Sequence, residues 1–434
     1  MVKVLRGGEM VAFSVLDPCR ALREARFWPA VRTLIVSLLA LVCMRNMYLD
    51  RFVPKGCLVI AFLVAMALYV IERGVKLPSI AFTLVTSFLC ITSAATMLHA
   101  GAPLGSLIIL IPCATMLVVL EAGEGETFWD VAESVAVVIG ALSLFDLLTI
   151  LLFPGGLYMS GLYFDHYLMG YKTTRTWLQV PAISMLAAVH VRRTGKIGWQ
   201  TVVLYVVSLA SNILTDSTMG TVGLLFMLFS AGIQYLGERR AKKSSTASEN
   251  DAGLRLVEDG ETGQEQPSHT RFFSVALVVA LALLAFSGVF YFTYKTALMQ
   301  TAVVTLTGKS ATFHGRSNIW DAAKRLISYS PWYGQGVVTT SIFTSLAQSR
   351  TATSTHSYLL SLLLSGGLLG LGVIVAGYVL ALYKLPSRRV TPANMCSLGL
   401  LANLFIGLTS CSTYSMLTLP LIAVTYRMAC EERG

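Results

Sequence analysis

Long apolar runs separated by short polar breaks dominate the chain. Most runs approach twenty residues, the length that an α-helix needs to cross the hydrocarbon core of a bilayer. They are continuous rather than alternating, which excludes the strands of a membrane β-barrel. The pattern predicts an all-α, polytopic transmembrane helical bundle of about 12 spans, at residues 29–47, 57–72, 78–98, 103–120, 131–153, 177–191, 199–214, 218–236, 272–293, 356–383, 393–410 and 412–428.

Composition supports a membrane protein. Of the 434 residues, 55% are hydrophobic and 13% are charged, and the mean hydropathy is +0.68. A soluble domain carries roughly 25% charged residues. The eight cysteines contain no C-x-x-C pair, and we interpret them as small apolar helix residues without disulfides or zinc.

The spans divide the chain into segments. Residues 1–28 lack the apolar core of a signal peptide, and we expect a cytoplasmic segment. Within it, Glu9–Trp28 could form either an amphipathic helix on the inner surface or a basic tail. Spans one to eight occupy 29–236, and a disordered cytoplasmic linker follows at 237–271. Span nine is 272–293. A large extracytoplasmic loop covers 294–355, and 356–434 hold spans ten to twelve and a short cytoplasmic tail.

Basic residues predict the orientation. Lys and Arg concentrate in loops that fall on one side, for example at Arg192, Arg193 and Lys196, which places both termini in the cytoplasm. The acidic residues are even more concentrated there, so the outer side keeps more net positive charge. Cations held outside, against the usual sorting, indicate that the outer face binds an anion.

The large loop contains an amphipathic helix. Ser317 or Asn318 can cap its start, and Ser330-Pro331 ends it. Its apolar residues recur at helical spacing: Ile319, Trp320, Ala323, Leu326 and Ile327. Lys324 and Arg325 fall on the opposite face. We expect this helix to lie ordered at the outer membrane surface.

Two separate outer loops supply candidate cations. Arg316 adjoins the start of the loop helix, so its guanidinium and the free amides there could bind one anion. Lys172 and Arg175 lie in an earlier outer loop, 154–176, before span six. Each could instead be an interfacial anchor. Together they suit a pyrophosphate, whose charge rises as it becomes a leaving group.

His356 and its neighbours open span ten. A histidine can serve as a base near neutral pH, although an interfacial residue hydrogen-bonded to Ser357 is the simpler interpretation of its position alone. His166 and His314 are weaker candidates of the same kind. The following small residues Gly366, Gly367 and Gly370 favour close helix packing.

Two acidic residues also stand out. Asp146 lies within span five, where it could pair with an arginine, carry a proton or face a wet cavity. Asp216 lies near the outer end of span seven among hydroxyl side chains, which suits hydrogen bonding to sugar.

The large loop resembles the bacterial O-antigen ligase and Wzy-type O-antigen polymerase superfamily. An arginine precedes a tryptophan, a P-x-x-G-x-G turn follows, and then come a histidine and a glycine-rich helix. The matching residues are Gly315-Arg316, Trp320, Pro331, Gly334, Gly336, His356-Ser357 and Gly366-Gly367-Leu368-Leu369-Gly370. The earlier outer loop lacks the family's usual P-N or D-N pair before Arg175, and Thr215-Asp216-Ser217-Thr218 stands where a cation is common.

The resemblance implies a GT-C-like membrane glycosyltransferase of the bacterial plasma membrane, acting on its outer side without a nucleotide sugar, metal or other cofactor and without nucleic acid. Its donor would be a glycan on undecaprenyl pyrophosphate, and its acceptor another lipid-linked unit (polymerase) or a lipid or wall glycan (ligase). Arg316 and His356 would be catalytic. Substrate would be bound by Arg175, Lys172, Lys324, Arg325, Asp216 and Ser357.

Other functions predict other features. A secondary transporter or flippase of polysaccharide precursors would carry charged residues deep in several spans and internal pseudo-symmetry, and Asp146 is the main charge of that kind. A non-catalytic membrane organiser gives no reason for two cationic outer loops. We therefore expect a lipid-linked glycan polymerase, with the ligase as the alternative.

Overall fold

The computed structural model describes residues 2–6, 9–13, 22–44, 48–74, 76–99, 104–160, 163–253, 274–297, 300–301, 305, 316–338, 340–348, 354–383, 385, 390–408, 410 and 414–432. Helices dominate this part of the chain. They are α2 (Trp28–Cys43), α3 (Gly56–Arg73), α4 (Ile80–His99), α5 (Ile111–Ala122), α6 (Glu126–Leu152), α7 (Thr176–Thr194), α8 (Trp199–Leu214), α9 (Thr218–Gly253), α10 (Val275–Thr293), α12 (Arg316–Tyr329), α13 (Thr340–Ala347), α14 (Tyr358–Leu382), α15 (Pro392–Ile406) and α16 (Pro420–Glu431).

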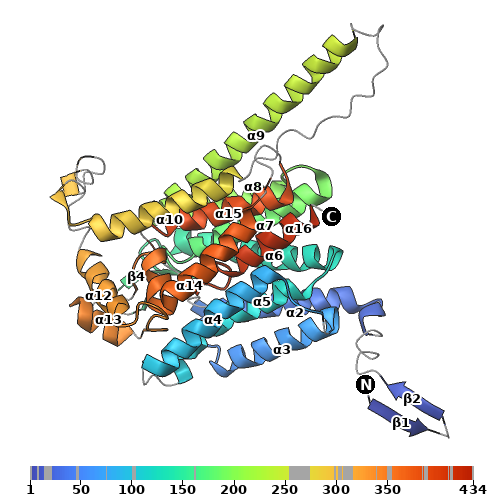
Figure 1. Cartoon of the computed structure of the whole chain (residues 1–434), viewed down its shortest axis with the longest axis horizontal. Helices are drawn as coiled ribbons and strands as arrows, with labels where there is room; N and C mark the ends of the chain where they lie inside the picture. The colour runs from blue at the N-terminus through green and yellow to red at the C-terminus, as the bar shows by residue number, and fades with distance from the viewer. Residues whose placement is uncertain are drawn as a thin grey trace.

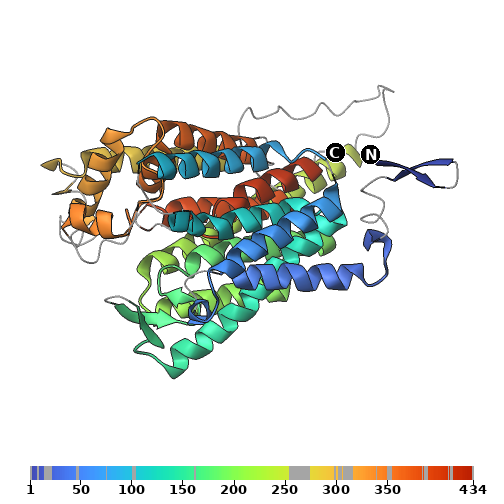
Figure 2. The same cartoon turned by 90° about the horizontal axis from the view of Figure 1, so that it is seen from below.

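The helices pack side by side into one bundle, with α12 and α13 at one end and the tip of α9 projecting beyond the other (Figures 1 and 2). A helix occupies each of the twelve predicted segments. Among the described residues, six helices are long and apolar enough to cross a membrane: Gly56–Arg73, Ile80–His99, Glu126–Leu152, Thr218–Leu236, Val275–Thr293 and Tyr358–Leu382. The prediction of a helical membrane protein is therefore confirmed, and the count of spans stays a prediction.

The predicted disordered linker is partly wrong. The helix α9 continues from its apolar part to Gly253, well into the segment that was expected to lack structure from residue 237. The sequence there contains Glu, Arg, Ala and Lys, which have high helix propensity even without an apolar face. Residues 254–273 lie outside the described residues. At the other end of the chain, Glu9–Phe13 pairs with Val2–Arg6 in a β-hairpin, so this part is not helical.

The centre of the bundle is formed by α7 and α15, which are almost entirely buried. They contact each other more extensively than any other pair of helices, and α6, α8, α9, α14 and α16 surround them. Many apolar side chains of the outer helices α3, α6, α8 and α10 are exposed, as expected where lipid is the solvent.

The loop of residues 154–176 folds into a small antiparallel sheet that the sequence pattern did not indicate. Its strands are β3 (Tyr158–Ser160), β4 (Tyr163–Tyr167) and β5 (Gly170–Tyr171), in that order. The amide of Met169 donates to Asp146 Oδ1 at 2.7 Å, and the amide of Leu168 donates to Thr149 Oγ1 at 3.3 Å. These bonds attach the sheet to the C-terminal end of α6.

Candidate functional site

The loop helix α12 is held by a cluster of aromatic rings. Trp320 is fully buried and makes edge-to-face contacts with Tyr291 and Tyr294 of the α10 end, at centroid distances of 4.9 and 5.0 Å. Such contacts stabilise by about 0.5–1.5 kcal/mol beyond the burial of area. The expected amphipathic helix is confirmed: its buried residues are Ile319, Trp320, Ala322, Ala323 and Leu326. It ends before Ser330, as predicted, but Arg316 is its first residue rather than the residue before it.

The glycines of the motif interlock two backbone segments. The helix α14 is broken at Gly367, where φ is 60° and ψ is −159°. The turn that follows α12 takes over the hydrogen bonds lost at this break. Gln335 and Gly336 donate to the carbonyls of Leu364 and Ser365 at 2.7 and 3.2 Å. In return, the amides of Leu368 and Leu369 donate to the carbonyls of Pro331 and Trp332 at 2.8 and 2.9 Å.

The contact explains why glycine is needed on both sides. A Cβ atom on Gly367 would lie 2.4 Å from the carbonyl carbon of Trp332, and one on Gly334 would lie 2.7 Å from the amide of Gly367. Gly336 approaches Thr96 of α4 equally closely. Gly366 and Gly370, by contrast, pack against Phe88 as the sequence predicted for small helix residues. The motif therefore fixes α12 against the start of α14.

His356 lies immediately before α14, in the left-handed region with φ 48°. A non-glycine residue with this conformation is uncommon and costs roughly 1–2 kcal/mol. The neighbouring residues hold the strained turn: Thr355 Oγ1 donates to the Ser357 carbonyl at 2.8 Å, and Ser357 Oγ caps α14 by accepting from Leu360 N. The Ser357 side chain is fully buried and caps α14. This geometry favours a structural role over the substrate binding that we expected.

Arg316 and His356 are brought together from segments forty residues apart. Burial and, to a smaller extent, the neighbouring positive charge of Arg316 together lower the pKa of His356 to about 4. Burial also lowers the pKa of Arg316, while Tyr291 and Tyr171 act in the opposite direction. Arginine stays charged in any protein environment. The site therefore pairs a half-buried guanidinium with an imidazole that is neutral near pH 7.

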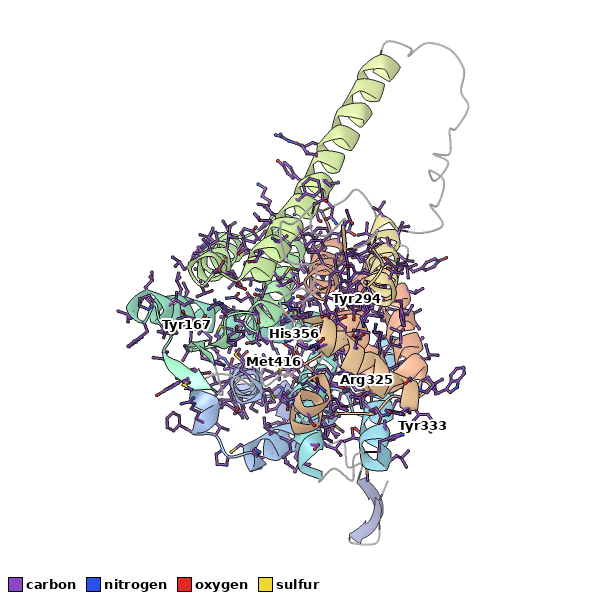
Figure 3. The ribbon with its side chains drawn as sticks, turned by 90° about the vertical axis from the view of Figure 1, so that its left-hand side faces the viewer. Tyr167, Tyr294, Arg325, Tyr333, His356 and Met416 are labelled. Carbon is purple, nitrogen blue, oxygen red and sulfur yellow. The ribbon has the colours of Figure 1, made fainter. Side chains whose placement is uncertain are left out.

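Tyr171 and Tyr291 are the residues near Arg316 that the sequence analysis missed. Tyr171 comes from β5 and Tyr291 from α10, so the sheet, α10, α12 and the start of α14 all contribute to the surroundings of this guanidinium. The aromatic residues Tyr291 and Tyr294 at the end of α10 could have indicated from the sequence that this end packs against the loop helix. Figure 3 views the molecule from this end, with His356 between Tyr167 on one side and Arg325 on the other.

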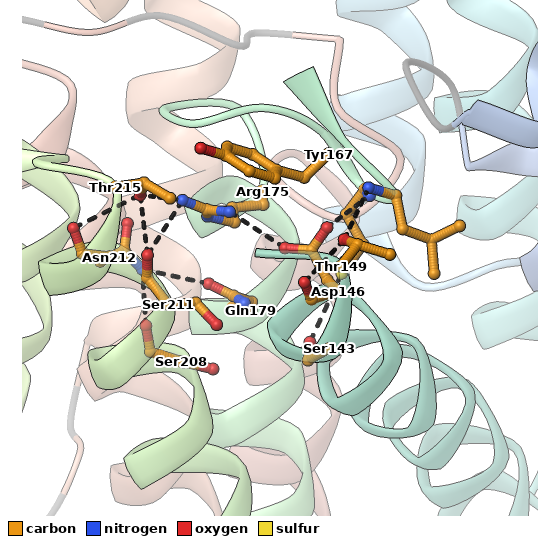
Figure 4. A network of polar contacts seen from close by, with 12 residues as sticks. Ser143, Asp146, Thr149, Tyr167, Arg175, Gln179, Ser208, Ser211, Asn212 and Thr215 are labelled. Atoms are coloured by element: carbon orange, nitrogen blue, oxygen red, sulfur yellow. Dashed lines mark hydrogen bonds and ion pairs between the residues drawn. The ribbon is translucent and has the colours of Figure 1, made fainter. Parts of the chain in front are cut away.

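Arg175 occupies a different environment from the one expected. Its side chain is fully buried, and Nη1 donates to Asp146 Oδ2 at 3.0 Å. Its Nη2 atom donates to the Ser211 carbonyl at 3.1 Å and to Thr215 Oγ1 (Figure 4). The ring of Tyr167 lies 5.5 Å from the guanidinium carbon. Of the alternatives for Asp146, pairing with an arginine is the one that the structure presents.

The remaining candidates lie at the same end of the bundle. Lys172 pairs with Asp165 at 3.0 Å. Asp216 is exposed and adopts a positive φ of 52°. Lys324 pairs with Asp321 at 3.2 Å, and Arg325 is exposed. The ring of His166 lies 5.2 Å from that of Tyr171, whereas His314 and Gly315 lie outside the described residues.

The fold and this site define a multi-pass helical membrane protein in which Arg316 of the loop helix α12 lies near His356 at the start of α14. Residues 203–375 match the family model described as O-antigen ligase. This match supports the O-antigen ligase and polysaccharide polymerase superfamily that the loop residues indicated. The match covers α8 to most of α14, including Arg316 and His356, but not Arg175. No curated protein and no solved structure matches the chain significantly.

Proposed function

We propose that the protein is a membrane glycosyltransferase that polymerises oligosaccharide repeat units carried on undecaprenyl pyrophosphate, at the extracytoplasmic face of the bacterial plasma membrane. The observation that carries the proposal is the proximity of the Arg316 guanidinium to a neutral His356. The match of residues 203–375 to the O-antigen ligase family model supports a glycan transferase of this class, polymerase or ligase.

The chemistry needs one base and one anion site. His356 takes the proton from the acceptor hydroxyl as the hydroxyl oxygen attacks the anomeric carbon of the donor. The bond from this carbon to the pyrophosphate oxygen breaks, and the leaving group departs with the electron pair. Arg316 stabilises the growing negative charge on the pyrophosphate. Because pyrophosphate is a good leaving group, no acidic side chain is needed to protonate it.

The role of Arg175 follows from its burial. With no exposed surface and three polar partners, its guanidinium is suited to holding α7, α6 and α8 together under the sheet that carries Tyr171. We therefore assign Arg175 and Asp146 a positioning role, in place of the direct pyrophosphate contact expected from the sequence.

The alternative is a ligase, which would transfer a finished glycan from undecaprenyl pyrophosphate to a lipid or wall acceptor. Both activities need the same donor site and differ in the acceptor. A secondary transporter or flippase of the precursors is a third candidate, and it would act without forming a glycosidic bond.

One reconstitution separates these functions. The purified protein in lipid vesicles is given synthetic undecaprenyl-pyrophosphate oligosaccharides without a nucleotide sugar, and the products are separated by size. Longer lipid-linked chains indicate a polymerase, and transfer only to an added lipid or wall acceptor indicates a ligase. Arg316→Ala and His356→Ala are expected to abolish either product while keeping the thermal unfolding of the wild type. Full activity of both variants would refute the site.

A further inference from the structure

An open depression of about 470 Å³ lies beside the outer end of α10 and along α12. Its lining residues are Lys295, Asp321, Lys324, Arg325 and Ser328. This volume is within the range of roughly 300–1,000 Å³ that is typical of small-ligand sites. The depression is distinct from the surroundings of His356, but it lies on the same helix as Arg316.

The charged groups of the depression other than Arg325 pair with one another through Asp321. Asp321 accepts from the Tyr294 hydroxyl at 2.7 Å and pairs with Lys295 and Lys324 at 2.7 and 3.2 Å. The Lys324 ammonium also lies 4.7 Å from the centre of the Tyr294 ring. With three donors, this carboxylate is occupied, and it holds both lysines in place.

The depression has a surplus of positive charge. Three cations line it, and Asp321 is the one acid among its lining residues. Arg325 is exposed, and its guanidinium has no ion-pair partner within the described part of the chain. A guanidinium in this position is suited to a planar, bidentate contact with a carboxylate or a phosphate.

We propose that this depression binds an acidic group of the glycan substrate, a uronic acid carboxylate or a phosphate substituent. The inference rests on the proposed function and names its substrate class. Lys324 and Arg325 follow Arg316 by eight and nine residues on one helix, which places them about 12–14 Å further along its axis. An acidic sugar bound there is separated from the pyrophosphate by a short stretch of glycan.

The surroundings favour a glycan over a lipid headgroup. The depression includes the hydroxyl of Ser328, and the next residue, Tyr329, is 77% exposed, so its ring is available for stacking on a sugar. Figure 3 views the molecule from the end that holds both α12 with Arg325 and the start of α14 with His356. A glycan that extends from the reaction site along α12 reaches the depression at this same end.

The test compares two soluble oligosaccharides that differ only in one uronic acid, replaced in the second by the corresponding neutral sugar. Binding to the purified protein in zwitterionic nanodiscs is measured calorimetrically. The wild type is expected to bind the acidic compound ~3–10-fold more tightly, the effect of one exposed charge-assisted contact. Arg325→Gln should bring this ratio close to one, and Arg325→Lys should keep part of it.

Lys196→Gln, an exposed cation at the other end of the bundle, is the matched control and should keep the wild-type ratio. Equal binding of the two compounds by the wild type, or an unchanged ratio in Arg325→Gln, would overturn the inference. So would loss of the ratio when anionic phospholipid is added, because headgroups would then be the occupant. Absence of glycan transfer alongside an Arg325-dependent ratio would count against the proposed function alone.

Discussion

The protonation of His356 is determined by two features of its surroundings. Burial disfavours the charged imidazolium, and the Arg316 guanidinium disfavours it further. Because the pKa is lowered to about 4, the imidazole is neutral at every pH well above that value. The arginine that we propose to bind the pyrophosphate therefore also helps to keep the proposed base unprotonated near pH 7.

A titration of His356 tests this arrangement. In protein labelled at its histidines, the His356 resonance, assigned with His356→Gln, is expected to titrate near pH 4 rather than 6.5. Arg316→Gln should raise the midpoint but leave it below 6.5, because burial is the larger cause of the shift. Arg193→Gln, at the other end of the bundle, should leave it unchanged. A wild-type midpoint near 6.5 would contradict the coupling.

Arg316→Lys tests the shape of the charge. A lysine keeps the positive charge but lacks the planar fork that binds two phosphate oxygens at once. We expect kcat/KM for glycan transfer to fall ~10–100-fold, the effect of losing about 1.5–3 kcal/mol of charge-assisted hydrogen bonding. The equivalent change at the exposed Arg26 serves as the control. Equal activity of Arg316→Lys and the wild type would show that only the positive charge of Arg316 is needed and that bidentate binding is not.

The buried pair Asp146–Arg175 gives a different prediction. Asp146→Asn leaves an uncompensated buried guanidinium and should reduce the free energy of unfolding by about 3–5 kcal/mol. Asp146→Asn/Arg175→Met removes both charges, keeps an acceptor for the Met169 amide, and should recover most of the stability and of the transfer activity. Thermal unfolding measures the stability, and the vesicle assay measures the transfer activity. Glu126→Leu, which breaks the exposed pair with Arg192, should have little effect.

The double variant also decides the role of Arg175. Recovery of activity together with stability is expected for a residue that positions the sheet. Recovery of stability without activity would show that the guanidinium itself contacts the substrate, and our assignment would be wrong.

At the scale of elements, the turn after α12 and the broken helix α14 form one unit. Neither segment can satisfy its own backbone: the break leaves two carbonyls and two amides of α14 without helical partners, and the turn supplies partners for all four. A buried backbone group without a partner costs about 1–3 kcal/mol. These four hydrogen bonds therefore fix α12, which begins at Arg316, relative to α14, which begins directly after His356.

Gly367→Ala should break this unit. The backbone at Gly367 occupies a region that is essentially restricted to glycine, and an added Cβ would meet the Trp332 backbone. We expect lower thermal stability and loss of glycan transfer. Gly372→Ala is the matched control, because it lies in the same helix with nothing within 4 Å of its Cβ and should be neutral or slightly stabilising. Wild-type behaviour of Gly367→Ala would show that the break is not needed.

The elements that the sequence predicted well are those with strong local signals. The helical spacing of apolar residues around Trp320 and the stop at Ser330-Pro331 predicted the bounds of α12 to within about one residue. The glycine pattern was recognised, but helix packing was expected where Gly367 in fact breaks α14. The sequence does not show this break, because the break is stabilised by hydrogen bonds to a distant segment, the turn at residues 331–336.

The site shows the same limit. Arg316 and His356 were found from their motif, whereas the ion pair of Arg175 depends on how α6, α7 and α8 pack, which no local pattern encodes. The sheet β3–β5 was missed because its strands are short and are held by bonds to α6 rather than by an alternating apolar pattern.

At the scale of the whole molecule, charged groups gather at two opposite ends. The end opposite to the site is held by ion pairs between distant helices. Glu121 is buried and pairs with Arg73 of α3, and Arg427 of α16 donates to the carbonyls of Leu120 and Gly123 at the end of α5. Among the described residues at that end, Arg32, Arg73 and Arg193 each pair with an acid, whereas Arg325 in the depression has no ion-pair partner among the described residues.

The last prediction concerns which end faces the cytoplasm. The proposed reaction requires the site to face outward, because lipid-linked glycans are elongated there without nucleotide sugars, and Lys and Arg sorting agrees. Single cysteines at Arg325 and Lys196, both exposed, are introduced after the eight native cysteines are replaced. In intact cells a membrane-impermeant maleimide should label Arg325→Cys directly and Lys196→Cys only after the plasma membrane is permeabilised. The reverse pattern would place Arg316 and His356 in the cytoplasm and exclude an extracytoplasmic polymerase or ligase.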